Sequence, residues 1–361
     1  MKNRDKCMGA YIGAAIGDAM GGPVECNHYA RIKKYVGEIK GLLPYKPPYT
    51  MMEPHPGYTL HPEAGSITDD TFIRKDLTKF FLETMPPRTT SMLVEWLLEN
   101  AEIDRQWPDI LVEALYKINR GETTPDDCGM TFKQGGGIGW WTPVAIVHAG
   151  DPEGAAREGR YLSSIWKAPL EKDLLAAVVA GIAEGLKDDA TYESMLKSMF
   201  AQCGPLATKL LDRAVKIAQS ATDVWDLADK LYKEILLPDH SMSPYKEINE
   251  FDPPIEADAE LPTRVVPVDY TDKPYINCFF AEQIPLAIAS FVFSKGSIDA
   301  IPVCCTLGRD CDTTATTVGA WVGALHGERG LPVQWVETVC RANMNEIDIR
   351  ALAEAIYKLE K

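Results

Sequence analysis

The sequence predicts an all-α fold, a single-domain bundle of many short helices, and three observations support this prediction. Apolar residues recur at helical spacing over 89–118, 152–166, 171–187 and 191–236. The chain has no Walker loop, HExxH helix or Ser-His-Asp spacing, and its glycine run at 135–139 lacks the final glycine of a dinucleotide fingerprint. Two acidic motifs lie on opposite sides of a Pro-rich stretch. Because a site built from both motifs would draw on both halves of the chain, we predict a single domain that spans residues 1–361.

The N-terminal segment is predicted to be a buried helix. Basic residues precede an apolar run from Met8 to Ile16, as in a signal peptide, but Gly9, Gly13 and Gly17 break it up. Glycine at every fourth position allows a neighbouring helix to pack closely. No run approaches the ~18 apolar residues that a membrane span requires, so we expect no membrane association.

A turn and a Pro-rich loop follow this helix. Two glycines and a proline at 21–23 are turn formers that deliver the carboxylate of Glu25 onto a loop, and Asp18 is expected to support that turn. A simpler interpretation is that Glu25 only pairs with a basic residue nearby. Proline recurs through 44–62, which excludes a regular helix. We predict a loop there, at the rim of a functional site that includes the acidic motif directly after it.

Two stretches place acidic residues just ahead of apolar helices. Residues 66–71 read SITDDT, and residues 308–319 read GRDCDTTATTVG, in which Asp310 and Asp312 precede a helix that is apolar on nearly all sides and therefore buried. Taken alone, each pattern is best explained as a helix cap, because Asp and Thr are preferred N-cap residues. Together with Glu25, however, they supply the carboxylate and hydroxyl oxygens that suit Mg²⁺ or Mn²⁺.

The middle of the chain is predicted to be helical and then irregular. Two helices are predicted over 89–118, and Gly121 closes the second. Residues 238–275 are Pro-rich and acidic. A structureless stretch of this length is usually functional or peripheral.

Composition limits the possible partners and compartment. With 46% hydrophobic and 25% charged residues, the chain has the composition of an ordinary globular protein. Its formal net charge of −15 argues against nucleic-acid binding, which depends on Lys and Arg contacts to phosphate. The nine cysteines form no CxxC pair, which favours reduced thiols and a cytoplasmic location.

The acidic stretches together resemble the ADP-ribosylglycohydrolase family. The resemblance rests on GDAMGGPVE at 17–25, SITDDT at 66–71 and GRDCDTTATTVGAWVGALHG at 308–327. Residues 281–287 resemble the helix before the last metal motif of that family, and the segment from Leu331 resembles the one after it. The resemblance covers nearly the whole chain in the right order, and it implies the same all-α fold and a metal-dependent glycoside hydrolase.

The resemblance also implies roles for particular residues. A binuclear Mg²⁺ or Mn²⁺ centre would be held by Thr68, Asp69, Asp70, Asp310, Asp312 and Thr313. Glu25 would be a catalytic or gating carboxylate, and Asp69 and Asp310 would favour the positive charge that develops at the anomeric carbon. The loop that contacts the ribose and phosphates in the family corresponds to Gly135, Gly136, Gly137 and Trp140.

Departures from the family pattern leave the substrate open. Arg309 and Cys311 stand within the last acidic motif, where relatives commonly have other residues, and Trp140 and Trp141 stand where relatives present Met-Arg. Losing that arginine removes a bidentate partner for phosphate. The substrate is therefore a ribosyl- or ADP-ribosyl-bearing molecule or protein, or alternatively a small ribofuranoside or nucleoside-like compound. A third alternative is that the chain is a catalytically silent binding or structural member of the family. For the two tryptophans, the alternative to a place in the substrate pocket is a place in the hydrophobic core.

Overall fold

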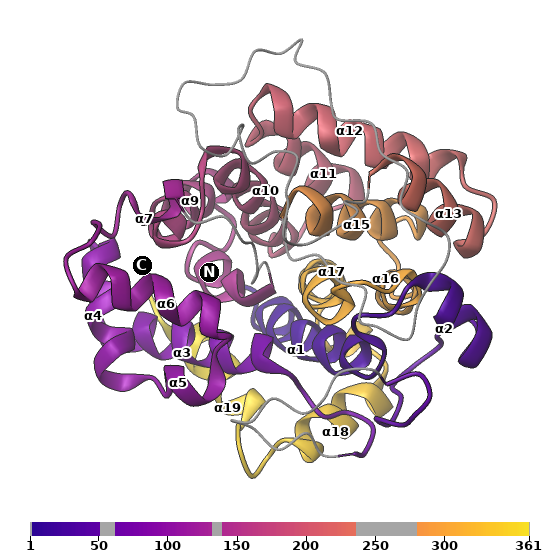
Figure 1. Ribbon diagram of the computed structural model, residues 1–361, viewed down its shortest axis with the longest axis horizontal. Helices are drawn as coiled ribbons and strands as arrows, with labels where there is room; N and C mark the ends of the chain where they lie inside the picture. The colour runs from indigo at the N-terminus through magenta and orange to yellow at the C-terminus, as the bar shows by residue number, and fades with distance from the viewer. Residues whose placement is uncertain (1, 51–61, 132–138, 236–279, 361) are drawn as a thin grey trace.

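The structure is a computed structural model that describes residues 2–50, 62–131, 139–235 and 280–360 (Figure 1). The predicted all-α class is confirmed, because these ranges contain helices and a single isolated β-bridge but no strand. One extensive hydrophobic core connects helices from both ends of the chain. The predicted loop at 238–275 lies outside the described residues, as does most of the one at 44–62.

The helix bounds follow the predicted pattern closely. In chain order they are α1 (Arg4–Gly21), η1 (Gly22–Val24), α2 (Tyr29–Tyr35), α3 (Asp69–Glu83), α4 (Thr90–Asn100), α5 (Ile103–Gln106), α6 (Asp109–Asn119), α7 (Cys128–Thr131), η2 (Gly139–Trp141), α8 (Thr142–Val147), α9 (Pro152–Leu162), η3 (Ser163–Ile165), α10 (Pro169–Gly185), α11 (Tyr192–Ala201), α12 (Pro205–Ser220), α13 (Val224–Glu234), α15 (Phe280–Phe293), α16 (Ala300–Leu307), α17 (Cys311–His326), η4 (Glu328–Gly330), α18 (Val333–Ala342) and α19 (Ile349–Lys358).

The region 89–118 differs from the prediction in one respect. It holds three helices instead of two, because the short α5 forms between α4 and α6. The apolar side chain of Ile103 is buried and starts this single turn, and Pro108 then caps α6. The four residues of α5 are too few for apolar residues to recur at helical spacing, so the sequence gives no periodic signal for this extra turn.

Two helices from opposite ends of the chain form the centre of the molecule. In Figure 1, α1 (indigo) and α17 (orange) lie side by side in the middle, with α10–α13 above them and α18 and α19 below. The predicted close packing at the glycines of α1 is present. A Cβ added at Gly13 would lie 2.3 Å from the carbonyl oxygen of Gly319, and one added at Gly17 would lie 1.9 Å from that of Ala315. Only glycine permits this approach.

Within the described ranges, the structure contains no helix with the length and apolar character needed to cross a membrane.

Candidate metal centre

Five carboxylates from three separate parts of the chain meet at the starts of α3 and α17. Carboxylate oxygens of Glu25, Asp310 and Asp312 all lie within 4.8 Å of one another, and the same holds for Asp69, Asp70 and Asp312. Asp312 belongs to both groups and therefore lies between them. The fold brings together carboxylates that the sequence separates by more than two hundred positions.

The two predicted threonine ligands join this cluster through their hydroxyls. Thr313 Oγ1 donates a hydrogen bond to Asp70 Oδ2 at 2.8 Å. Thr68 Oγ1 lies 3.0 Å from Asp312 Oδ2 and 2.7 Å from Asp18 Oδ1, and can donate to either. The six residues predicted to hold the metals thus lie together, and their role as ligands stays a prediction.

The chemistry of the cluster fits a hard cation. Asp70 and Asp312 are buried, and the Oδ1 atom of each has no hydrogen-bond partner within the described part of the chain. A buried polar oxygen without a partner is costly, and a bound cation would remove that cost. Because all the candidate ligand atoms are carboxylate or hydroxyl oxygens, the set suits a hard cation and not a soft one.

The carboxylates also perturb one another. Burial raises the pKa of Asp312 well above its usual range, and the charges of Glu25 and Asp310 raise it further. The pKa of Asp70 is raised well above normal by burial and then by Asp69. Glu25 follows the same pattern, with burial first and Asp310 second. So much negative charge in a buried site favours the uptake of positive charge.

Backbone hydrogen bonds fix Glu25 opposite the turn that carries Asp310. The amide of Cys26 donates to the carbonyl of Arg309, and the amide of Arg309 donates to the carbonyl of Asn27, both at 2.7 Å. Cys26 and Arg309 have positive φ angles of 62° and 65°, a conformation that is unfavourable for non-glycine residues and that clusters at functional sites. Gly308 supplies the predicted turn, with a φ of 74°.

The role expected for Asp18 is corrected by the structure. Its side chain accepts hydrogen bonds from the amide of Thr68 at 2.9 Å and the amide of Thr71 at 3.1 Å, and also from both hydroxyls. The carboxylate of Asp18 therefore holds the first turn of α3, and the contribution of Asp18 to the turn before Glu25 is its backbone carbonyl, which accepts a hydrogen bond from the amide of Gly22. The sequence could not show this, because the partners lie fifty residues away.

The helix-cap interpretation explains only one of the two acidic motifs. Thr68 is the N-cap of α3, and its hydroxyl accepts from the amide of Asp70 at 3.4 Å. Asp310 is the N-cap of α17, but its side chain makes no capping hydrogen bond. The carboxylate of Asp310 instead accepts a hydrogen bond from Gln283, which leaves it within the acidic cluster.

Two residues that border the site, Tyr45 and Gly139, are not among the predicted site residues. The hydroxyl of Tyr45 is buried without a partner in the described ranges, and a Cβ added at Gly22 would lie 2.1 Å from it. Burial and then the charges of Asp18 and Asp312 raise the pKa of this phenol well above normal. At η2, a Cβ added at Gly139 would lie 3.0 Å from Asp70 Oδ1. Neither residue carries a signal in the sequence beyond its place in a predicted loop.

The predicted substrate-binding residues are only partly described. Gly135, Gly136 and Gly137 lie outside the described residues. Trp140 is 1% exposed and stacks on Trp141 with ring centroids 5.2 Å apart. Trp107 and Trp166 pack against its edge at 5.3 and 5.4 Å. This enclosure matches the core interpretation, and a substrate contact by Trp140 stays a prediction.

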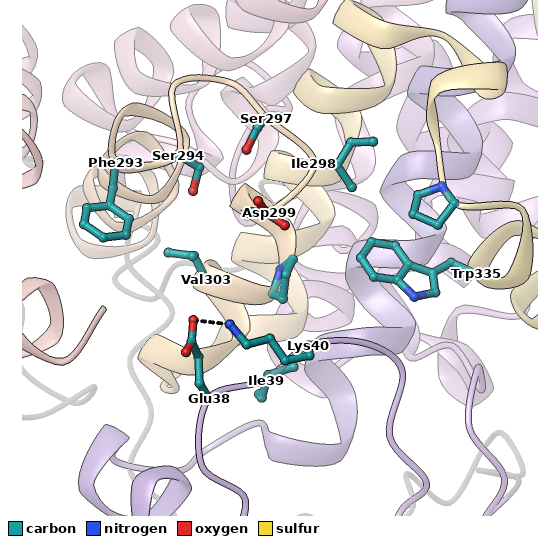
Figure 2. Close-up of a pocket in the computed structure, with 12 residues that line it drawn as sticks. Glu38, Ile39, Lys40, Phe293, Ser294, Ser297, Ile298, Asp299, Val303 and Trp335 are labelled. Carbon is teal, nitrogen blue, oxygen red and sulfur yellow. Dashed lines mark ion pairs between the residues drawn. The ribbon is translucent and has the colours of Figure 1, made fainter. Parts of the chain in front are cut away.

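A separate pocket of about 530 Å³ lies at the other end of α16 (Figure 2). Phe293 and Trp335 stand on opposite sides of it, and an ion pair between Lys40 and Glu38 lies at one edge. The pocket lies at the N-terminal end of α16, whereas the turn with Asp310 follows its C-terminal end. No predicted site residue lines it.

Comparisons with known proteins identify the family and the fold of the chain. The family model described as ADP-ribosylglycohydrolase matches residues 1–361. A solved structure titled "ADP-ribosylglycohydrolase-related protein complex" superimposes with a TM-score of 0.59 at 18% sequence identity, covering 99% of each chain. At this identity the likeness shows the fold alone. No curated protein matches the chain.

Proposed function

The chain belongs to the ADP-ribosylglycohydrolase family, and on that premise we propose that it cleaves the glycosidic bond of a ribosyl or ADP-ribosyl group at a binuclear Mg²⁺ or Mn²⁺ centre. Membership of the family makes it a hydrolase of glycosyl bonds. The observation that carries the finer proposal is the pair of carboxylate groups that share Asp312, each within 4.8 Å.

The proposed ligands are those that the family resemblance implies. Thr68, Asp69, Asp70, Asp310, Asp312 and Thr313 would hold the two ions. Once bound, the ions would supply Lewis acidity, which polarises the hydroxyls of a ribose and lowers the pKa of water.

The protein groups around the ions have separable tasks. Glu25 is partly exposed and lies on a loop that is pinned to the Asp310 turn, so it is placed to take up or deliver a proton at the open side of the cluster. Asp69, which is also partly exposed, and Asp310 would stabilise the positive charge that develops at the anomeric carbon. The hydroxyl of Tyr45 is a buried group still available for a hydrogen bond to the sugar.

One observation favours the small ribofuranoside as an alternative substrate. Trp140 and Trp141 are both fully enclosed, and residues 139–147, which contain them, include no arginine that could bind a pyrophosphate. A compact, weakly charged substrate would not need that partner.

A hydrolysis panel tests the proposal. The protein would be stripped of metal, reloaded with Mg²⁺ or Mn²⁺, and assayed on ADP-ribosyl-arginine, ADP-ribosyl-serine, free ADP-ribose conjugates and nucleosides. We expect metal-dependent release of the ribosyl group from at least one substrate, and loss of that release in Asp312→Asn. Full activity in protein shown by elemental analysis to be metal-free would refute the metal centre, and no release from any substrate would favour the silent alternative.

A further inference from the structure

Two successive residues of α15, Glu282 and Gln283, form hydrogen bonds with two successive residues of the acidic turn, by which we mean Gly308–Asp310. The guanidinium of Arg309 donates to both carboxylate oxygens of Glu282, at 2.7 and 2.8 Å. The next residue along each segment repeats the contact, because the side-chain amide of Gln283 donates to Asp310 Oδ2. All four side chains are buried.

This contact acts on a turn that has an unfavourable backbone conformation. Arg309 has a φ of 65°, which costs free energy for a residue with a Cβ and persists only where the surroundings hold it. Its backbone is held by the loop after Glu25, and its side chain is held by Glu282. Arg309 therefore connects three segments, and the carboxylate of Asp310 follows directly from it.

The start of α15 is itself anchored. The amide of Phe280 donates to Glu171 Oε1 on α10 at 3.1 Å, and Glu171 is buried. The first turn of α15 is thus fixed to a long core helix. It can serve as a rigid support for the acidic turn.

The charges within the contact also matter. The bidentate pair neutralises Glu282, so this buried carboxylate does not compete for a cation with the five of the acidic cluster. Gln283 is neutral and donates a single N–H to Asp310, which leaves the charge of Asp310 intact. The contact therefore orients the carboxylate of Asp310, a proposed metal ligand, and does not neutralise its negative charge.

We propose that Glu282 and Gln283 are positioning residues, which hold the Gly308–Asp310 turn so that the Asp310 carboxylate faces Glu25 and Asp312. This inference rests on the proposed metal centre. Residues that orient metal ligands through hydrogen bonds are worth about 10- to 100-fold in metal affinity. A role in fold stability alone would instead change the melting temperature and leave the affinity unchanged.

The first experiment compares Gln283→Leu with Ser290→Ala. Ser290 lies on the same helix, is buried, and loses a hydrogen bond to the carbonyl of Leu286 when replaced, but none of its hydrogen bonds in the described part of the chain reaches residues 308–313. Mn²⁺ affinity would be measured by calorimetry on metal-stripped protein. Amide hydrogen exchange of the metal-free protein would report on residues 308–313.

We expect Gln283→Leu to weaken Mn²⁺ binding by about 10- to 100-fold and to speed exchange in the turn, while Ser290→Ala changes neither. Wild-type Mn²⁺ affinity and wild-type exchange in Gln283→Leu would overturn the inference. If the wild-type protein binds no divalent cation, the proposed metal centre fails, and the exchange data then decide separately whether Gln283 holds the turn.

A second experiment separates positioning from charge balance. Glu282→Gln and Arg309→Gln each leave a buried charge without its partner, so both single variants should melt well below the wild type. The double variant removes both charges and should recover most of that melting temperature. We expect its Mn²⁺ affinity to stay about 10-fold or more below wild type, because the ion pair that links the side chain of residue 309 to α15 is then lost, while its backbone hydrogen bonds to the loop after Glu25 remain. Recovery of full affinity in the double variant would contradict the inference.

Discussion

Replacing Asp312 by asparagine should stabilise the metal-free protein and at the same time remove its response to metal. Asp312 belongs to both carboxylate groups, within 4.8 Å of its neighbours. Two unit charges at 4.8 Å repel by about 3 kcal/mol at an effective dielectric constant of ~20. An asparagine removes this repulsion, and its NH₂ group can donate to a neighbouring carboxylate where Asp312 Oδ1 now has no partner in the described ranges.

The expected gain follows from this repulsion. Relieving one pair should raise the free energy of unfolding of the metal-free protein by about 1–3 kcal/mol, since partial screening and proton uptake reduce the full value. With an unfolding entropy of ~2.1 cal/mol/K per residue over 361 residues, this corresponds to a rise of about 1–4 °C in Tm. Wild type should gain about 2.7 kcal/mol when Mn²⁺ is present at 100 times its Kd, and Asp312→Asn should gain much less.

The assay is a thermal melt of both proteins in chelator and in excess Mn²⁺. The variant should melt above the wild type in chelator and below it in Mn²⁺. Asp109→Asn is a matched control, because Asp109 also lies in the first turn of a helix, α6, but is exposed; it should leave the Mn²⁺ response unchanged. A variant that melts below the wild type in chelator, yet keeps the full Mn²⁺ response, would refute the assignment of Asp312 to a cation site.

Four further substitutions test other parts of the argument. Glu25→Gln should lower kcat by about 100-fold or more while the Mn²⁺-induced rise in Tm persists. A wild-type kcat in this variant would show that Glu25 takes no part in the reaction. Tyr45→Phe removes a buried hydroxyl without a described partner, so Tm should not fall, whereas kcat/KM should drop by about 10-fold; an unchanged kcat/KM would place the phenol outside the reaction. Gly13→Ala forces a Cβ to 2.3 Å from a carbonyl oxygen of α17 and should lower the free energy of unfolding, measured by chemical denaturation, by about 1–3 kcal/mol. The control Gly41→Ala, where the added Cβ meets only a tryptophan side chain at 3.3 Å, should lower it little. Equal losses in the two variants would contradict close packing of α1 on α17. Trp140→Ala should raise KM if the indole contacts substrate, and should lower Tm at constant KM if it is core.

The sequence predicted the parts of the fold that periodicity and composition encode. The helical spacing of apolar residues placed most helices, and the glycine spacing of α1 indicated its close contact with a neighbour. Local turn chemistry likewise placed the loop before Glu25 and the turn at Gly308. These features depend on near neighbours in the chain, so the sequence alone is enough to locate them.

The sequence could not predict contacts that depend on the packed fold. Asp18 is a helix residue whose four hydrogen bonds go to the start of α3. The conformation of Arg309 is unusual for its type, and it is held by backbone hydrogen bonds to the loop after Glu25 and by Glu282, twenty-seven residues earlier, which binds the guanidinium. The hydroxyl of Tyr45 enters the acidic cluster only because η1 presents glycine at that point. Each is a tertiary effect without a local signature.

The glycine contact between α1 and α17 also explains why the acidic cluster, the proposed metal centre, lies where it does. The contact continues past the helices' middle to Gly21, where an added Cβ would lie 2.4 Å from the Cα of Asp312. The Cys311 thiol donates to the carbonyl of the same glycine at 3.4 Å. The last turn of α1 is therefore packed directly on the first turn of α17, and η1 with Glu25 follows at once. The interaction that builds the core thus also sets the distance between Glu25 and Asp312, so the shape of the acidic cluster is determined by the main helix contact of the fold as well as by its loops.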